Sequence, residues 1–208
     1  MAAIRFAAIL GPVFGPVFGS VADLSVTLSV ARADARSAVI GLCYRRSIHL
    51  QKANNVSVTL GKKVGDFSAA ATGQQFSLAS QAGKVVVLYF YPKDNTPGCT
   101  TEGADFRDAM AGFTRANSVV FGISRDSLKS HENFKAKMSF PFELIADPDE
   151  AVCEHFGVMK MKNMYGKQVR GIERSTFVIG ADGTLLREWR GVKVPGHVAE
   201  VLSFVESL

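Results

Sequence analysis

The stretch that decides the fold runs Val85-Val-Val-Leu-Tyr-Phe-Tyr91-Pro92-Lys-Asp-Asn-Thr-Pro-Gly-Cys99. Its first seven residues are aliphatic, β-branched or aromatic, which is typical of a central strand covered on both faces. Pro92 ends this run, because proline removes a backbone donor. After the Pro97-Gly98 turn, Thr100–Phe113 has apolar residues at helical spacing. The stretch therefore predicts a buried strand, a short loop and a helix, with Cys99 where the helix begins.

The alternation of strand and helix continues along the chain. Ser118–Ser124 is a second apolar run, and Ser127–Met138 has helical spacing with Ser127 as a candidate N-cap. Phe142–Ile145 indicates a short strand, and Asp149–Phe156 indicates a short helix. Strands that alternate with helices in this way usually pair in parallel.

The C-terminal part of the chain carries a hairpin signal. Glu173–Ile179 and Thr184–Val192 flank the turn Gly180-Ala-Asp-Gly183, and this hairpin is expected at a sheet edge. His197–Leu208 follows a Pro-Gly breaker pair and predicts an amphipathic helix. Together these elements predict one α/β domain over residues 56–208.

Composition and charge agree with a single enzyme-like domain. The chain has 208 residues, 47% of them hydrophobic, and a formal net charge of +5. Residues 1–55 hold six basic and two acidic residues, which leaves 18 basic and 17 acidic residues in the remainder. The domain is therefore nearly neutral, and it lacks the basic stripe that is typical of nucleic-acid binding.

Residues 1–55 read differently from the rest and form an N-terminal extension with three open interpretations. Arg5 before an apolar run, together with several arginines and serines, resembles a targeting segment. The extension could equally be disordered, or untranslated if synthesis starts near Val56. Pro12 and Pro16 interrupt the apolar run, which argues against a membrane-spanning helix.

The three cysteines, Cys43, Cys99 and Cys153, form neither a CxxC pair nor a zinc-ligand spacing with the four histidines. No metal and no cofactor are therefore predicted. So few cysteines fit a reducing compartment. The protein is expected in the cytoplasm, or in an exported or organellar location if residues 1–55 are a targeting segment.

Cys99 has the setting of a reactive thiol. Free backbone N–H groups and the positive end of the helix dipole favour an anion at a helix N-terminus. Such settings generally favour the thiolate, which is the nucleophilic form of cysteine. We therefore expect Cys99 to be a nucleophile.

The pattern P-x-x-x-T-x-x-C, formed by Pro92, Thr96 and Cys99, resembles the peroxiredoxin superfamily. The wider match looks like the peroxiredoxin Q branch, also called bacterioferritin comigratory protein. It includes Tyr91–Glu102, Gly122–Ser124, Asp126-Ser127, Ser130-His131 and Arg174–Phe177. The resemblance covers residues 56–208. It implies a thioredoxin-like fold, with a central mixed sheet flanked by helices.

The resemblance also implies an activity and a partner. The protein is expected to be a thiol-dependent peroxidase that reduces hydrogen peroxide and alkyl hydroperoxides through a sulfenic acid at Cys99. Thioredoxin or a low-molecular-weight thiol is the expected reductant. The protein is expected to be a monomer or a weak dimer, with neither nucleic acid nor membrane as a partner.

The roles of the remaining site residues follow from the same resemblance. Thr96 is expected to place its hydroxyl beside the thiolate and the incoming oxygen, and Pro92 to shield the pocket from water. Arg174, expected on a strand, is implied to stabilise both the thiolate and the leaving oxygen, because its guanidinium offers several donors. Glu102 is implied to orient Arg174.

One departure from the family bears on how the sulfenic acid is recycled. Ala104 and Lys135 occupy the two positions at which related chains keep a resolving cysteine, so a one-cysteine mechanism is expected. Cys153 is a possible resolving residue, but its apolar surroundings favour a buried, inert role. Cys43 is a weaker candidate.

Two other functions and several other residues stay open at this point. A disulfide exchanger on the same fold would need a CxxC pair, and a redox sensor would turn over slowly. His131 and His155 are expected in capping, surface or core roles. The basic residues Lys160, Lys162, Lys167 and Arg170 are interpreted as a solvated loop, with a docking surface for an acidic reductant as the alternative.

Overall fold

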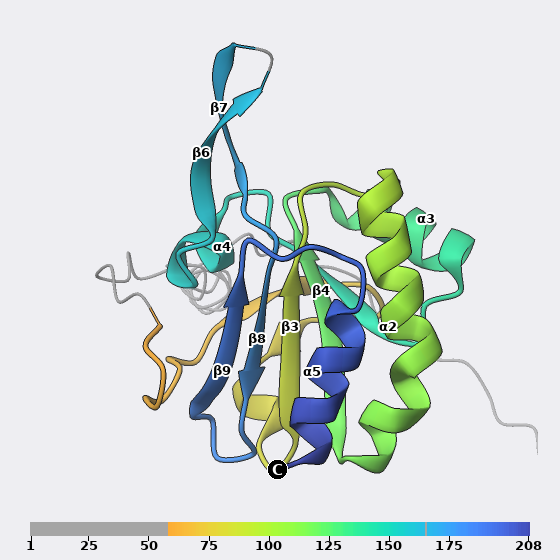
Figure 1. Cartoon of the computed structure of the whole chain (residues 1–208), viewed down its shortest axis with the longest axis vertical. Helices are drawn as coiled ribbons and strands as arrows, with labels where there is room; N and C mark the ends of the chain where they lie inside the picture. The colour runs from red at the N-terminus through yellow and green to blue at the C-terminus, as the bar shows by residue number, and fades with distance from the viewer. Residues whose placement is uncertain (1–57, 165) are drawn as a thin grey trace, which may run out of the picture. The chain divides into compact units, whose positions relative to one another are not determined.

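The computed structural model describes residues 58–164 and 166–208. The interpretations of residues 1–55, and the candidate Cys43, lie outside the described residues. Figure 1 shows the described part as a twisted sheet with helices on both faces and one projecting hairpin. In this part of the chain, no helix is both long and apolar enough to cross a membrane.

The core of the fold is a seven-stranded mixed sheet with the order β2-β1-β5-β4-β3-β8-β9. Strands β3, β4 and β5 pair in parallel, whereas β8, β9, β1 and β2 join the sheet antiparallel. The strands are β1 Ser68–Ala71, β2 Phe76–Ser77, β3 Val85–Phe90, β4 Ser118–Ser124, β5 Glu143–Ala146, β8 Ser175–Ile179 and β9 Leu185–Arg190. The predicted parallel pairing and the hairpin β8–β9 at one edge are confirmed.

Strand β3 is covered on both faces, as its continuous apolar sequence predicts. Val86, Leu88 and Phe90 belong to one buried cluster, while Val87, Tyr89 and Tyr91 belong to a second. Because side chains alternate along a strand, the two clusters lie on opposite faces of the sheet. Each face therefore has its own hydrophobic core.

The helices divide between these two cores. They are α2 Pro97–Arg115, α3 Leu128–Met138, α4 Ala151–His155, α5 His197–Glu206 and the 3-10 helix η1 Ala79–Gln81. Helices α2, α3 and α5 supply the core that contains Tyr89, and α4 supplies the core that contains Leu88. Figure 1 shows α2 and α5 side by side on one face. The expected thioredoxin-like arrangement of a mixed sheet between helices is confirmed.

Two local features fix the helices that carry the site. Ser127 caps α3 as predicted, because its hydroxyl accepts the Ser130 N–H at 3.3 Å. Gly103 lets α2 approach the loop before β5, since an added Cβ would lie 2.5 Å from Cζ of Phe140. A side chain at position 103 would therefore push α2 away from the core.

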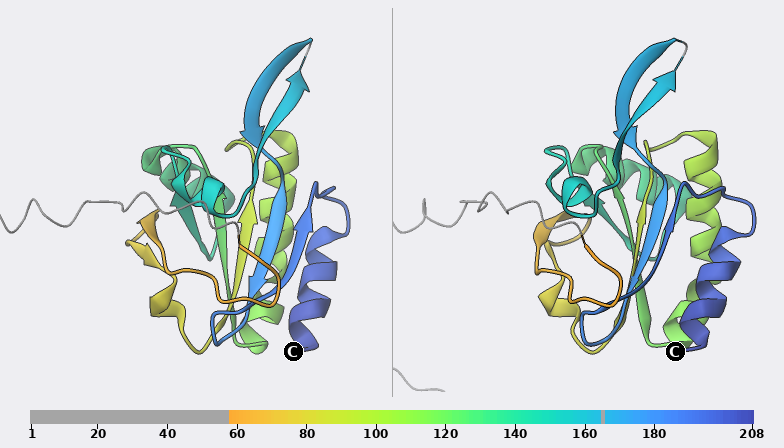
Figure 2. Two further views of the ribbon diagram at one scale, coloured as in Figure 1. Left: turned by 90° about the vertical axis from the view of Figure 1, so that its left-hand side faces the viewer. Right: turned by 60° about the vertical axis from the view of Figure 1, so that its left-hand side comes forward.

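The structure corrects three expectations from the sequence. The basic residues Lys160, Lys162, Lys167 and Arg170 lie on a two-stranded hairpin, β6 Met159–Met164 and β7 Lys167–Ile172, and not in a solvated loop. Arg174 precedes β8 and is not on a strand. The short helix begins at Ala151, because Glu150 has a left-handed φ of 61°. Figure 2 shows the hairpin standing out from the body of the sheet.

Candidate active site

Cys99 lies in the first turn of α2, at the end of the sheet where β3 stops. Thr96 is the N-cap residue, and the first helical hydrogen bond runs from the Thr100 N–H to the Thr96 carbonyl at 2.9 Å. Asn95 has a left-handed φ of 57°, a conformation that asparagine tolerates better than most residues. This turn directs the chain from β3 into α2. Cys99 is only 2% exposed, so its side chain is almost completely shielded from bulk solvent.

Arg174 reaches Cys99 from the segment just before β8. Its Nη2 atom donates to the Cys99 sulfur at 3.3 Å, and its Nη1 atom donates to Oε2 of Glu102. Both donors belong to one planar guanidinium, which can serve two acceptors at once. The structure thus brings together Cys99, Arg174 and Glu102, which are separated by up to 75 residues in the sequence.

Glu102 is fully buried, and Arg174 donates to only one of its two carboxylate oxygens, Oε2. Burial raises the pKa of Glu102 to about 7, although Arg174 acts in the opposite direction. Among the described residues, neither Oε1 of Glu102 nor the buried hydroxyl of Tyr89 has a hydrogen-bond partner. Burial raises the pKa of Tyr89 well above its usual value, with further contributions from Glu102 and Cys99. The carboxylate that holds Arg174 is therefore in a poorly solvated environment.

Thr96 and Pro92 lie in the segment that joins β3 to α2, just before Cys99, and both are half-buried. The Thr96 hydroxyl donates to the carbonyl of Lys93 at 3.1 Å, which stabilises the loop from within. A contact between this hydroxyl and the thiolate stays a prediction. The shielding role of Pro92 also stays a prediction.

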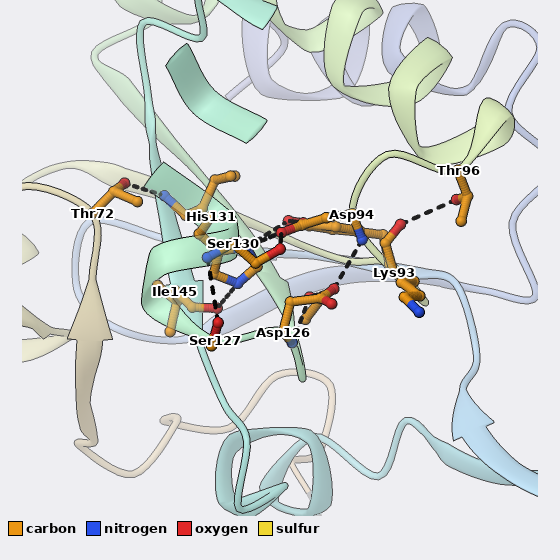
Figure 3. A network of polar contacts seen from close by, with 12 residues as sticks. Thr72, Lys93, Asp94, Thr96, Asp126, Ser127, Ser130, His131 and Ile145 are labelled. Carbon is orange, nitrogen blue, oxygen red and sulfur yellow. Dashed lines mark hydrogen bonds and ion pairs between the residues drawn. The ribbon is translucent and has the colours of Figure 1, made fainter. Parts of the chain in front are cut away.

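A buried polar network supports the loop from its other side (Figure 3). Asp94 is 5% exposed, and its carboxylate accepts hydrogen bonds from Tyr91 Oη at 2.8 Å and Ser130 Oγ at 2.7 Å. His131 Nδ1 lies 3.0 Å from the same carboxylate. Burial opposes the charge of Asp94, but the hydrogen bonds from His131 and Ser130 hold the pKa of Asp94 below its usual range. The loop that carries Cys99 is thus tied to α3.

The backbone of this loop is held as well. The Asp94 N–H donates to Oδ2 of Asp126 at 2.8 Å, and the Ser124 hydroxyl donates to the same oxygen. No functional role for Asp94 or Asp126 was expected from the sequence. Both residues lie within the stretches that resemble the family, Tyr91–Glu102 and Asp126-Ser127, and Asp94 also lies in the loop before Cys99.

Cys153 lies in α4 on the opposite face of the sheet. It is fully buried in the core that contains Leu88, whereas Cys99 belongs to the core that contains Tyr89. Burial raises the pKa of the Cys153 thiol strongly, and Asp147 adds to this effect. Both cysteines are free thiols. Cys153 therefore has the environment of an inert core residue.

The other residues discussed from the sequence have structural contacts. Lys135 pairs with Glu143 at 2.5 Å on the surface of α3 and β5. His155 is half-buried against the rings of Phe67 and Phe156. Over residues 58–164 and 166–208, no group of three or more His, Cys, Asp or Glu side chains could hold a metal ion.

Comparisons with known proteins now decide the family. The profile of the AhpC/TSA family matches residues 60–187. The chain belongs to this family. Peroxiredoxin Bcp of Xanthomonas campestris is 53% identical over 135 residues, which cover 65% of this chain and 84% of that protein. Peroxiredoxin Bcp of Bacillus subtilis is 44% identical over 154 residues, covering 74% and 98% of the two chains.

Solved structures support the same family. A structure of the Xanthomonas campestris bacterioferritin comigratory protein, studied for alkyl peroxide reduction, has a TM-score of 0.65 at 50% identity and covers 68% of this chain and 90% of its own. A cysteine-to-serine variant of Xylella fastidiosa peroxiredoxin Q has a TM-score of 0.69 at 42% identity, with coverage of 72% and 96%. This chain is therefore a peroxiredoxin of the Bcp or Q type, and hence a thiol peroxidase.

Proposed function

We propose that this peroxiredoxin reduces hydrogen peroxide and alkyl hydroperoxides by attack of the Cys99 thiolate on the O–O bond. The observation that carries the proposal is the 3.3 Å contact between Nη2 of Arg174 and the Cys99 sulfur, in the first turn of α2. A guanidinium at this distance can donate to the sulfur and stabilise negative charge during the attack. The name of the Xanthomonas campestris relative, studied for alkyl peroxide reduction, supports organic hydroperoxides as substrates.

The chemical step needs few groups. The Cys99 sulfur forms a bond to one peroxide oxygen while the O–O bond breaks, so that sulfur is oxidised to a sulfenic acid and the peroxide is reduced. The second oxygen leaves as hydroxide or alkoxide and takes up a proton to become water or an alcohol. Arg174 is the donor best placed to stabilise negative charge that moves from sulfur to the leaving oxygen.

The surrounding loop would hold the peroxide in line for this attack. The backbone N–H groups of Gly98 and Cys99 point out of the first turn of α2, where intrahelical acceptors are missing. In this proposal Thr96 turns its hydroxyl from the Lys93 carbonyl to the peroxide when substrate enters. Pro92, half-buried beside it, keeps bulk water from the sulfur.

We further infer a one-cysteine cycle with an external thiol. Two thiols R–SH return the sulfenic acid to the Cys99 thiol and yield a disulfide and one molecule of water. The burial of Cys153 on the opposite face of the sheet supports this cycle, because a disulfide needs Cα atoms within about 7 Å. Thioredoxin and small thiols are the two candidate classes of reductant.

Turnover distinguishes this enzyme from a sensor that uses peroxide as a signal. The purified protein is supplied with excess dithiothreitol and hydroperoxide, and the peroxide consumed per protein is counted. An enzyme consumes many equivalents, and Cys99→Ser consumes none. One equivalent per protein, followed by slow recycling, would support a sensor.

A further inference from the structure

Oxygen atoms of Asp94, Ile145 and Tyr91 surround the ring of His131. Its Nδ1 atom lies 3.0 Å from Oδ2 of Asp94, and its Nε2 atom lies 3.2 Å from the carbonyl oxygen of Ile145. The nearby Tyr91 hydroxyl uses its hydrogen on Asp94 at 2.8 Å. A neutral imidazole has one donor and one acceptor nitrogen. Both ring nitrogens of His131 therefore face an acceptor oxygen, an arrangement in which each nitrogen can donate.

This pair joins two elements that form the site. Asp94 lies in the loop between Pro92 and Cys99, and His131 lies on α3 with its side chain fully buried. In Figure 3 the carboxylate of Asp94 points at His131 and Ser130, away from the Thr96 side of the loop. A buried charged pair with further hydrogen bonds tolerates few alternative geometries, since any displacement leaves a charge without a partner.

We propose that Asp94 and His131 form a buried ion pair that positions the loop carrying Thr96 and Cys99 for attack on the peroxide. Neither residue touches the reacting atoms, so both are positioning residues. This inference rests on the proposed function of Cys99. It extends that function by assigning the geometry of the loop to residues on a different helix.

Two single variants test the positioning role. Asp94→Asn removes the negative charge of the pair, and His131→Gln removes the imidazole. Each is expected to lower the bimolecular rate of hydrogen peroxide with the reduced protein about ten- to hundredfold, the range expected for a misplacement of roughly 1 Å. Alkylation of Cys99 by iodoacetamide, which needs no in-line pocket, should change little. The double variant should be no slower than the slower single variant, because both changes break one interaction.

Ser127→Ala is the matched control. It removes the cap of α3 without touching the pair, so it weakens the same helix by another route. The peroxide rate of this variant should equal that of the wild type. A rate that falls as far in Ser127→Ala as in Asp94→Asn would overturn the proposal, because the rate would then follow helix stability alone. An unchanged rate in both Asp94→Asn and His131→Gln would overturn it as well.

A measurement on the wild type covers the case in which the variants do not fold. In protein labelled with ¹⁵N at histidine, nuclear magnetic resonance at neutral pH should show a proton on each ring nitrogen of His131. A proton on one nitrogen only would contradict the ion pair. Loss of peroxidase activity from the wild type itself would instead count against the function of Cys99, so the two failures are distinguishable.

The β6–β7 hairpin carries a second, independent inference. Residues 159–172 include Lys160, Lys162, Lys167 and Arg170 and no acidic residue. The remainder of residues 56–208 holds 14 basic and 17 acidic residues, so the hairpin is positively charged while the rest of these residues has a net negative charge. Arg170 is paired with Glu150 at 3.0 Å and with Glu154 at 2.6 Å, which anchors the hairpin to α4.

The three lysines share one face of the hairpin. In the register of β6 and β7, Lys162 lies opposite Val169, and Lys160 and Lys167 fall on the same side, because directly paired residues share a face. Val169 is 42% exposed on this face, and Met161 is 61% exposed on the other. A two-stranded sheet with apolar groups in water is only marginally stable by itself. A partner that covers the hairpin would remove this exposure.

The hairpin is also close to the site. Its second strand ends at Ile172, two residues before Arg174, which limits the backbone separation to about 7 Å. It rises from the same end of the sheet at which β3 ends and α2 begins (Figure 1). We propose that the lysine face of this hairpin docks a protein dithiol reductant with an acidic surface, and so places that dithiol near oxidised Cys99. This proposal rests on the external reductant proposed above.

The test compares a protein reductant with a small neutral one. Lys160→Glu/Lys167→Glu should raise the KM for thioredoxin, supplied with its reductase and NADPH, about tenfold or more, as expected for charge reversal at a docking surface. Turnover with dithiothreitol should not change. The control Lys62→Glu/Lys84→Glu makes the same change in net charge on exposed lysines away from the hairpin. It should leave both reactions unchanged.

Two outcomes would overturn the docking proposal. The first is an unchanged thioredoxin KM in the hairpin variant, and the second is an equal rise in the control. In the first case, loss of self-association in the hairpin variant, measured by sedimentation, would assign the hairpin to contacts between copies. Continued turnover with dithiothreitol keeps each outcome separate from a failure of the peroxidase function.

Discussion

The Nη2 atom of Arg174 lies 3.3 Å from the sulfur of Cys99, while Nη1 of the same guanidinium donates to buried Glu102. Burial opposes the charge of Arg174, but Glu102 and Cys99 together hold the pKa of Arg174 above its usual range. A permanent positive charge therefore faces the sulfur. The position of this charge is set by Glu102, which lies in the same first turns of α2 as Cys99.

Arg174→Ala is expected to slow the reaction with peroxide. Loss of one donor to a developing oxyanion typically lowers rates about 100- to 1,000-fold, and the fold should persist because Arg174 lies outside the sheet. Stopped-flow measurement of hydrogen peroxide with the reduced protein gives the rate. Arg115→Ala, an exposed arginine at the other end of α2, is the control and should react normally. An Arg174→Ala variant as fast as the wild type would show that the guanidinium does not act in the step.

Glu102→Gln should change how stability depends on pH. Burial raises the pKa of Glu102 from 4.5 to about 7, so the folded protein holds this proton more tightly than the unfolded chain does. The resulting stabilisation is complete below pH 4.5 and is lost as pH rises towards 7. The free energy of unfolding of wild type relative to Glu102→Gln should therefore fall across this window, by on the order of 3 kcal/mol.

Urea titrations at several pH values measure this difference. Glutamine keeps an oxygen acceptor for Arg174 but cannot ionise, so the variant isolates the charge. Glu132→Gln, an exposed carboxylate on α3, serves as the control and should run parallel to the wild type. Parallel curves for Glu102→Gln and the wild type would mean that folding does not raise the pKa of Glu102.

Cys153→Ser should leave turnover with an external thiol nearly intact. The residue lies on the opposite face of the sheet from Cys99, and its backbone N–H donates to Asp147 at 2.7 Å, which fixes it in α4. Steady-state rates with dithiothreitol and with thioredoxin test this directly. A high yield of a Cys99–Cys153 disulfide after one equivalent of peroxide, with loss of thioredoxin-driven turnover in the variant, would replace the one-cysteine cycle.

High peroxide should inactivate the wild type. A sulfenic acid without an internal partner waits for an external thiol, and during this time a second peroxide can oxidise it to the sulfinic acid. Activity is measured after incubation with increasing hydroperoxide under slow supply of thiol, and the Cys99 peptide is weighed by mass spectrometry. Sulfinic acid at Cys99 should increase as activity falls. Full activity at high peroxide would indicate rapid internal protection.

The sequence predicted the two central strands that are covered on both faces. Strand β4 has the predicted bounds Ser118–Ser124, and β3 follows the run that starts at Val85, because both strands are apolar on two faces. The hairpin β6–β7 escaped prediction because its lysines alternate with methionines and both faces meet solvent. Strand β1 escaped because Ser68–Ala71 is short and lacks the β-branched residues typical of strands.

Site residues could be predicted where a local sequence pattern indicates a reactive group. Cys99 and Arg174 stand out through a helix start and a family pattern, and the structure joins them across 75 residues. The pairing of Asp94 with His131 depends on how α3 packs against the loop, which local patterns do not encode. Ser130-His131 belonged to the family resemblance, so a role was hinted at, but the partner became visible only in three dimensions.

The role of Cys99 as the nucleophile is tested by its chemical state after one equivalent of hydrogen peroxide. The reduced protein is oxidised in the presence of dimedone, digested and weighed peptide by peptide. We expect one dimedone adduct on the peptide that contains Cys99, with Cys153 still a free thiol, and no adduct in Cys99→Ser. Peroxide consumption without any change at Cys99, or an adduct that persists in Cys99→Ser, would show that Cys99 is not the nucleophile.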